Sequence, residues 1–326
     1  SRLLLFPGYT RPSVSQEVQF TFTTRPLRVS INRKNIVFVD GVRTPFLMSG
    51  TDYAKLMPHE LARHSLLHLP REIIDYVIYG TVIQDGENQQ HRREELRFKR
   101  RVILKKSCSY CPMACISSNQ GITTEKTGVS KDNGCKRSNR EKLSSLKPAF
   151  IKPHGTITAT DGASACLIMT EEKAKQLGLK PKAYLRDFVY VSQDPKDQLL
   201  LGPTYATPKV LERAGLGVQD IDVWEVHEAF AGQILANLRA MDSDWFAKEF
   251  MNRSQKVGVP DIDKWNKWGG SLSIGHPFAA TGVRLTVHTA NRLIREDGQF
   301  GLIAACAAGG QGVGMIIERH PDGKAT

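Results

Sequence analysis

The sequence predicts an α/β fold built in layers, and three observations carry that prediction. Short runs rich in β-branched residues alternate with helix-like segments from residue 147 onward, which is typical of strands covered by helices. Hydrophobic residues make up 40% of the 326-residue chain and charged residues 24%, as in a folded globular protein. No run of about eighteen apolar residues occurs, so no membrane-spanning helix is expected.

The N-terminal part contains few regular segments. A buried strand is predicted at 35–40, where NIVFVD is apolar and β-branched, and a turn is predicted at 41–46. A helix begins at Pro58, because a proline in the first turn loses no helical hydrogen bond. A second strand is predicted at 76–83, and residues 132–140 are predicted to form a loop.

Strands and helices alternate regularly after residue 147. Thr170 and Thr207 are the predicted N-caps of two helices, with Pro208 in a first turn and Gly215 closing the second helix. Strands are predicted at 163–169, 183–192, 221–225, 301–305 and 314–318, and helices at 170–178, 207–215, 229–241 and 281–295.

The net charge of +12 is distributed unevenly. Residues 91–147 hold 15 basic and 5 acidic residues, whereas residues 148–326 hold 20 of each. A basic segment can bind nucleic acid or a membrane surface. The most basic stretch, 91–106, has one aromatic residue, Phe98, so it offers little for stacking on bases and nucleic-acid binding is disfavoured. Segment 1–30 has four arginines and one acid, which predicts a leader resembling a mitochondrial transit peptide; a basic tail is the alternative.

Six cysteines in a chain of this length do not indicate a disulfide framework, and they fit a reducing compartment. Cys108, Cys111 and Cys115 have the spacing C-x2-C-x3-C. A zinc site is disfavoured because no second cysteine pair and no matching histidine pair accompanies them.

Four short sequences place reactive side chains at the ends of predicted elements. In MACISSN, Cys115 enters a predicted helix, whose dipole lowers a thiol pKa; a buried structural cysteine is the alternative. His227 follows the strand 221–225, at the edge where open α/β sheets bind ligands, although a core or capping histidine fits equally. His276 in GGSLSIGHP could activate a thiol or donate to an oxyanion. Cys306 begins CAAGGQG, and the four side chains together predict acyl-transfer chemistry.

These four sequences, in this order, resemble the thiolase family. Cys115 resembles the acyl-accepting cysteine, HEAF at 227–230 resembles the NEAF box, GHP at 275–277 carries the histidine of the family, and Cys306 resembles its second cysteine. His227 in place of the usual asparagine, Ala308 in place of a usual glycine and the run 182–215 resemble in particular the thiolase subunits of mitochondrial trifunctional enzymes.

The resemblance implies a 3-ketoacyl-CoA thiolase, an acetyl-CoA C-acyltransferase of fatty-acid β-oxidation. Cys115 would accept the acyl chain as a thioester, and His276 would help to activate it. Cys306 would protonate the departing acetyl-CoA enolate and then deprotonate CoA. One oxyanion would be bound by His276 and, directly or through water, by His227, and the other by the backbone N–H groups of Cys115 and Ala308. No metal or redox cofactor is implied, since CoA is a substrate.

The resemblance also implies where and with what the chain works. The expected substrates are 3-ketoacyl-CoA and CoA, and the expected protein partners are a second copy in a homodimer and the α subunit of a trifunctional complex. The expected location is mitochondrial, on the matrix side and associated with the surface of the inner membrane.

For the fold, the resemblance implies a layered α-β-α-β-α stack of two similar halves, with the N-terminal half truncated here. Residues 1–30 would be the leader, 31–165 an incomplete N-terminal half and 166–326 the C-terminal half. Segment 85–111 does not resemble the family, and 125–147 would be the remnant of a loop domain that is mostly missing. More than a hundred family residues are expected between Glu125 and Thr127 and have no counterpart.

Two alternatives remain for the function. A condensing enzyme of the ketosynthase or HMG-CoA synthase kind also uses a cysteine nucleophile, but it needs no second catalytic cysteine, so Cys306 argues against it. A catalytically impaired thiolase relic, acting only as a binding or structural subunit, is compatible with a truncated N-terminal half, because missing strands leave unpaired sheet edges.

Overall fold

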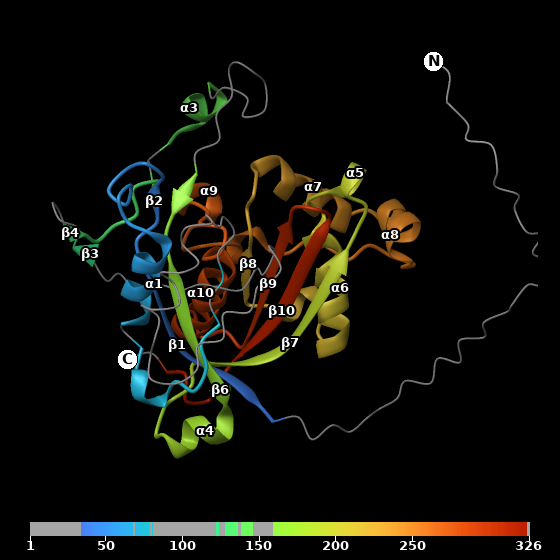
Figure 1. Cartoon of the computed structure of the whole chain (residues 1–326). Coiled ribbons are helices and arrows are strands. Elements are labelled where there is room, and N and C mark those ends of the chain that lie inside the picture. Colours follow the sequence, from blue (N-terminus) through green and yellow to red (C-terminus); the bar gives the residue numbers. More distant parts are fainter. Residues whose placement is uncertain are drawn as a thin grey trace, which may run out of the picture. The chain divides into compact units, whose positions relative to one another are not determined.

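The computed structural model describes residues 34–67, 69–78, 80, 122–123, 128–135, 138–145 and 159–324, all of which belong to one compact unit (Figure 1). The leader predicted at 1–30 and the atypical segment 85–111 lie outside the described residues. The division into halves at 165–166 stays a prediction. No helix in the described part of the chain is long and apolar enough to span a membrane.

Six strands form one mixed sheet in the order β6-β1-β7-β10-β9-β8. These strands are β1 (Ile36–Arg43), β6 (Ser164–Thr170), β7 (Ala183–Ser192), β8 (Val223–Val226), β9 (Phe300–Ala307) and β10 (Gln311–Arg319). β8 and β9 are parallel, with Val226 opposite Ala304, and the other neighbours are antiparallel. Two small sheets pair β2 (Leu47–Met48) with β5 (Thr160–Asp161) and β3 (Ile122–Thr123) with β4 (Gly128–Val129).

Helices pack on both faces of the six-stranded sheet in the described part of the chain. The helices of this part are α1 (Pro58–Leu66), α3 (Arg140–Ser144), α4 (Glu171–Gln176), α5 (Pro195–Gln198), α6 (Gly202–Ala214), α7 (Ala231–Met241), α8 (Asp244–Met251), α9 (Ser271–Ile274) and α10 (Thr281–Arg295), with 3-10 turns at Arg71–Ile73, Val218–Asp220 and Ile262–Lys264.

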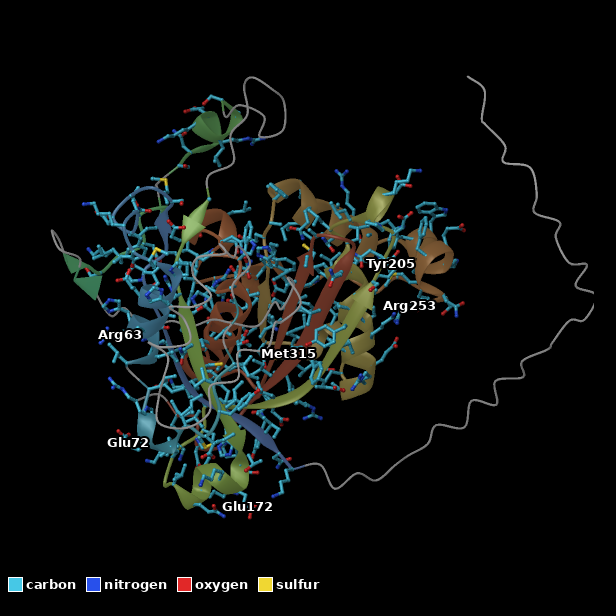
Figure 2. All side chains as sticks on the ribbon, viewed as in Figure 1. Arg63, Glu72, Glu172, Tyr205, Arg253 and Met315 are labelled. Atoms are coloured by element: carbon cyan, nitrogen blue, oxygen red, sulfur yellow. The ribbon has the colours of Figure 1, made fainter. Side chains whose placement is uncertain are left out.

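Helix α10 is enclosed by the curled sheet. It contacts β8, β9 and β10 on one side and β1 and β6 on the other, and its residues Leu285, Val287 and Leu293 are fully buried. Met315 of β10, labelled in Figure 2, belongs to the same core. Because both sets of strands bury apolar side chains against it, α10 forms the middle layer.

Two outer layers complete the stack. Helices α6, α7 and α8 cover the far face of β7–β10. Tyr205 of α6, labelled in Figure 2, contacts Phe246 of α8, and their ring centroids are 5.8 Å apart. Helices α1 and α4 cover the far face of β1 and β6, through residues such as Leu66 and Ala174. Figure 1 shows the resulting order of α1, then β1 and β6, then α10, then β8–β10, then α6. The predicted α-β-α-β-α layering is therefore present.

Most predicted elements of the C-terminal part are confirmed within one or two residues. The helix predicted at 281–295 is α10, the strand at 183–192 is β7, and the helix at 170–178 is α4, where the Thr170 hydroxyl accepts from the Lys173 N–H at 3.2 Å. The α8 helix was not predicted. Its eight-residue sequence DWFAKEFM mixes apolar and charged residues and buries only Phe246 and Ala247.

The predicted start of the helix at 207–215 is wrong. Helix α6 begins at Gly202, so Pro208 lies inside the helix and Thr207 is not its N-cap. An interior proline removes a helical hydrogen bond, but here residues 202–208 are buried against β10 and β7, and tertiary packing overrides the local signal. The end is as predicted, because Gly215 has a φ of 71°, the left-handed conformation that favours glycine.

The N-terminal predictions are confirmed in part. Strand β1 continues through 41–43, where a turn was predicted, because a bulge between Phe38 and Asp40 lets it stay paired with β6 as far as Ser164. Of the strand predicted at 76–83, the described residues show a single bridge at Val77, and Ile78 is 79% exposed. Of the loop predicted at 132–140, the described residues 132–135 and 138–139 lie outside helices and strands, and Arg140 begins α3. The carboxylate of Asp132 binds the guanidinium of Arg43.

Candidate functional site

Two histidines from distant parts of the chain meet at the carboxyl end of β8. His227 follows β8 directly, and its N–H donates to the Ala304 carbonyl at 2.8 Å, which extends the pairing of β8 with β9. His276 lies between α9 and α10. The two imidazole rings are 4.1 Å apart between centroids and tilted by 43°. The sequence placed both at element ends, and the structure brings them together.

The His276 ring is held by the chain on either side of it. Gly275 has a φ of 98°, and a Cβ there would lie 2.6 Å from Thr160 Cγ2, so glycine is required for the approach. His276 Nδ1 lies 2.6 Å from Thr281 Oγ1, whose hydroxyl also donates to the Pro277 carbonyl at 3.3 Å. Thr281 therefore accepts the Nδ1–H, and His276 Nε2 is left with a free lone pair.

His227 is held by side chains that the sequence analysis did not single out. Ser271 Oγ lies 3.0 Å from His227 Nδ1, and Arg284 Nη2 donates to the same oxygen at 2.9 Å. The Arg284 guanidinium lies 3.4 Å from the Glu225 carboxylate, which also binds Arg292 at 2.8 Å. All of these charged side chains are fully buried.

An asparagine fixes the backbone that leads to His227. The side-chain amide of Asn266 accepts from the Val226 N–H at 2.9 Å and donates to the Val226 carbonyl at 2.8 Å. It also donates to Glu228 at 2.6 Å, and the other carboxylate oxygen of Glu228 accepts from the Leu272 N–H at 3.2 Å. The strand end at His227 and the start of α9 are thus tied together.

Both histidines are neutral at pH 7. Burial, reinforced by the positive charge of Arg284, lowers the pKa of His276 from 6.5 to about 4. Burial also lowers the pKa of His227 well below its usual value, and His276 and Arg284 lower it further. A neutral imidazole has one donor and one acceptor nitrogen, so each ring can both give and receive a hydrogen bond.

Cys306 lies near the end of β9, opposite Gly312 of β10, and is 7% exposed. Burial raises the pKa of its thiol to about 12, so the group is protonated at neutral pH and can serve as a proton donor. Ala308 follows in the turn formed by Gly309 and Gly310, which have φ values of 85° and 73°.

A cavity of about 550 Å³ adjoins His276. Its wall includes Tyr53, Leu61, Thr160 and Ser164 together with His276 and residues 278–280. A volume of this size is in the range that accommodates a small ligand. His276 therefore faces a space that a substrate could enter.

Cys115 lies outside the described residues, as do Cys108 and Cys111. Its approach to His276 and its backbone contribution to an oxyanion site stay predictions. Within the described ranges, no three His, Cys, Asp or Glu side chains are grouped so as to hold a metal ion.

The chain is similar in sequence to several known proteins. The family described as Thiolase, C-terminal domain, matches residues 179–319, which include His227, His276 and Cys306. The trifunctional enzyme subunit beta, mitochondrial, of Homo sapiens is 43% identical over 425 residues, which cover 89% of this chain and 90% of that protein. The probable 3-ketoacyl-CoA thiolase of Caenorhabditis elegans is 40% identical and covers 89% of this chain and 95% of itself.

The chain belongs to the thiolase family. It is thus an acyltransferase by family, and the comparisons favour a thiolase over the ketosynthase and HMG-CoA synthase alternatives.

Solved structures show the same thiolase fold. The human mitochondrial 3-ketoacyl-CoA thiolase superimposes with a TM-score of 0.69 at 22% identity, covering 88% of this chain and 99% of that one. The acetyl-CoA acetyltransferase of Bacillus anthracis gives a TM-score of 0.67 at 22% identity, with coverages of 88% and 99%.

This thiolase is shorter than its relatives within the matched region. The match to the human subunit extends over 425 residues, whereas the chain has 326, so at least 99 matched positions have no residue here. This agrees with the large internal deletion expected from the sequence. Within the described residues, β6 and β8 are the two outer strands of the sheet.

Proposed function

We propose that this thiolase cleaves 3-ketoacyl-CoA with CoA in mitochondrial fatty-acid β-oxidation. The observation that carries the proposal is the pair of neutral histidines 4.1 Å apart, at the same end of the parallel strands β8 and β9 that carries Cys306. The printed names of the relatives, a trifunctional enzyme subunit beta and 3-ketoacyl-CoA thiolases, support the choice of substrate.

In the first half-reaction, His276 Nε2 takes the thiol proton of Cys115, and the thiolate attacks the 3-keto carbon. The bond between carbons 2 and 3 breaks, which leaves the acyl chain on Cys115 as a thioester and releases the acetyl-CoA enolate. Cys306, whose thiol is protonated at neutral pH, gives its proton to carbon 2 of that enolate.

In the second half-reaction, the Cys306 thiolate takes the proton of the CoA thiol. The CoA sulfur attacks the thioester, the bond to Cys115 breaks, and Cys115 recovers a proton from His276. Oxygen charge that develops on the substrate would be stabilised by hydrogen bonds from His276 and His227, and elsewhere by the backbone N–H groups of Cys115 and Ala308. Such donors act strongly when they are fixed before the reaction, as the buried contacts of both histidines ensure.

The partners and location follow from the relatives and form part of the proposal. The α subunit of a trifunctional complex and a second copy of this chain are the proposed protein partners, since the human relative is a subunit beta. The mitochondrial names of the relatives support a mitochondrial location. We place the chain on the matrix side, associated with the inner-membrane surface.

Thiolysis by the purified full chain tests the function. We expect conversion of a 3-ketoacyl-CoA and CoA to acetyl-CoA and a shortened acyl-CoA, measured by chromatography. Cys115→Ser should abolish conversion, and Cys306→Ala should lower kcat by at least about 10²-fold through loss of the proton donor. Cys166→Ala is the matched control, because Cys166 is a partly buried cysteine whose pKa is also raised to about 12 but which lies on β6, and the kcat of this variant should be unchanged.

The second candidate is the impaired relic that acts only as a binding subunit. The outer position of β6 and the shortened match favour it, since strands missing from the N-terminal half would remove the support of Cys115. Conversion by the wild-type chain that does not exceed conversion by Cys115→Ser would select this candidate and reject the proposed thiolysis.

A further inference from the structure

A buried row of side chains leads from a charge pair to the site histidine. Glu225 lies 3.4 Å from Arg284, Arg284 donates to Ser271 Oγ at 2.9 Å, and Ser271 Oγ lies 3.0 Å from His227 Nδ1. Glu225 and Arg284 are fully buried, and Ser271 is 8% exposed. Since water has little access, the hydrogen bonds of this row must be satisfied within the protein.

The direction of the Ser271 bond follows from what each group can donate. A guanidinium only donates, so Ser271 Oγ accepts from Arg284 and keeps its own hydroxyl hydrogen. Among the described residues, the hydrogen bonds of Ser271 Oγ are those to Arg284 and His227. If His227 Nδ1 also donated to Ser271 Oγ, the Ser271 hydroxyl hydrogen would be buried without an acceptor, which is unfavourable. Ser271 therefore donates to Nδ1, and the imidazole proton lies on Nε2.

We propose that Ser271 and Arg284 are positioning residues that hold His227 as the Nε2–H tautomer, the form that donates a hydrogen bond to the substrate carbonyl oxygen. The inference deepens the proposed thiolysis and rests on it. Glu225 supports it indirectly by fixing the Arg284 guanidinium.

The assignment gives the Nε2 atoms of the two neighbouring rings opposite hydrogen-bonding roles. Thr281 accepts from His276 Nδ1–H, which leaves His276 Nε2 as an acceptor for a thiol proton. Ser271 donates to His227 Nδ1, which leaves His227 Nε2–H as a donor. A base and an oxyanion donor are thus set side by side by their hydroxyl partners alone, without any charge on either imidazole.

The tautomer can be measured in the substrate-free full chain. Nitrogen-15 NMR of histidine-labelled protein distinguishes protonated from unprotonated ring nitrogens, and the His227 signals are assigned by their loss in His227→Asn. We expect a protonated Nε2 and an unprotonated Nδ1 in the wild type. An Nδ1–H form, or an equal mixture, would overturn the proposal without reference to any variant.

Ser271→Ala should shift His227 toward a mixture of tautomers and lower kcat roughly tenfold, with KM changed less than about threefold. This loss is smaller than the 10²–10³-fold typical of deleting an oxyanion donor itself, because the ring remains. Ser271→Thr, which keeps the hydroxyl, should restore both the Nε2–H tautomer of His227 and the wild-type kcat. Ser273→Ala is the matched control on α9, since the Ser273 hydroxyl donates to the Gly270 carbonyl at 3.0 Å. This variant should change neither the tautomer of His227 nor kcat.

An unchanged kcat in Ser271→Ala would reject the positioning role. Failure of the proposed function can be told apart from failure of this proposal, because the tautomer can be measured even if the wild-type chain shows no thiolysis. In that case a protonated Nε2 upholds the tautomer assignment, and a protonated Nδ1 rejects it.

Discussion

His227, His276 and His288 lie around the Arg284 guanidinium, and burial lowers the pKa of all three. A histidine whose pKa is lower in the folded than in the unfolded state binds fewer protons when folded at mildly acidic pH. Stability must therefore rise with pH across the interval between the two values, and the full contribution is present above the unfolded pKa near 6.5. The site histidines thus make the fold sensitive to acid.

We predict that the free energy of unfolding falls as pH is lowered from about 6.5 to 4. A pKa of about 4 for His276 corresponds to a loss of roughly 3 kcal/mol from this residue alone, and the other two histidines add losses of the same sign. Urea unfolding at several pH values between 4.5 and 7.5 measures the slope. His276→Gln should flatten it, and a wild-type stability that is constant or rises toward acid would contradict the prediction.

At the residue scale, the sequence singled out His227, His276 and Cys306 as candidates, because each stands at an element end beside small residues, and their roles stay predictions. It did not identify Ser271 or Arg284. Ser271 is 44 residues from His227 along the chain, and Arg284 is 59 residues from Glu225, so their contacts exist only after folding. A fully buried arginine inside the apolar pattern of α10 is a signal that could have pointed to a polar network, since such charges are rarely buried without partners.

At the scale of elements, helix α6 shows how tertiary contact moves a boundary. The local pattern Thr-Pro predicts a start at 207, yet the helix begins at Gly202 because that residue meets β10. A Cβ on Gly202 would lie 2.7 Å from the Gln311 carbonyl oxygen and 2.7 Å from Gly312 Cα, both backbone atoms. A close approach between two backbones is not visible in the local helix propensity of the sequence. The capping residue of α4 and the apolar periodicity of α10, by contrast, are local features, and both predicted their helices.

Gly202→Ala is expected to lower the free energy of unfolding by about 2–4 kcal/mol, because neither backbone atom of β10 can move without disturbing the sheet. Chemical denaturation measures the change. Gly232→Ala on α7 is the matched control, since a Cβ there meets nothing within 4 Å and alanine favours a helix by roughly 0.5–1 kcal/mol. Equal stabilities of Gly202→Ala and the wild type would show that α6 and β10 are not in tight contact.

At the scale of the whole described unit, the two sets of strands are joined in two ways. β1 pairs with β7 through Val37 opposite Tyr184 and Phe38 opposite Ala183, and α10 contacts both sets. The sequence predicted the strands but not their order, since pairing of β1 with β6 and β7 joins segments more than a hundred residues apart. The layering was implied by the resemblance and is present in the structure. It depends on which faces of the strands and helices are apolar rather than on the order in which the strands pair.

Because α10 is shared, the N-terminal and C-terminal strands are predicted to lose protection together when it is damaged. Leu285 of α10 is fully buried, and Leu285→Ala should cost about 2–5 kcal/mol. Hydrogen exchange should then accelerate in β1 and β6 by a factor similar to that in β9 and β10. Leu235→Ala, at a leucine 58% exposed on α7, removes the same atoms without a cavity and should leave exchange unchanged. Acceleration confined to β8–β10 would show that the N-terminal strands fold independently of the middle helix.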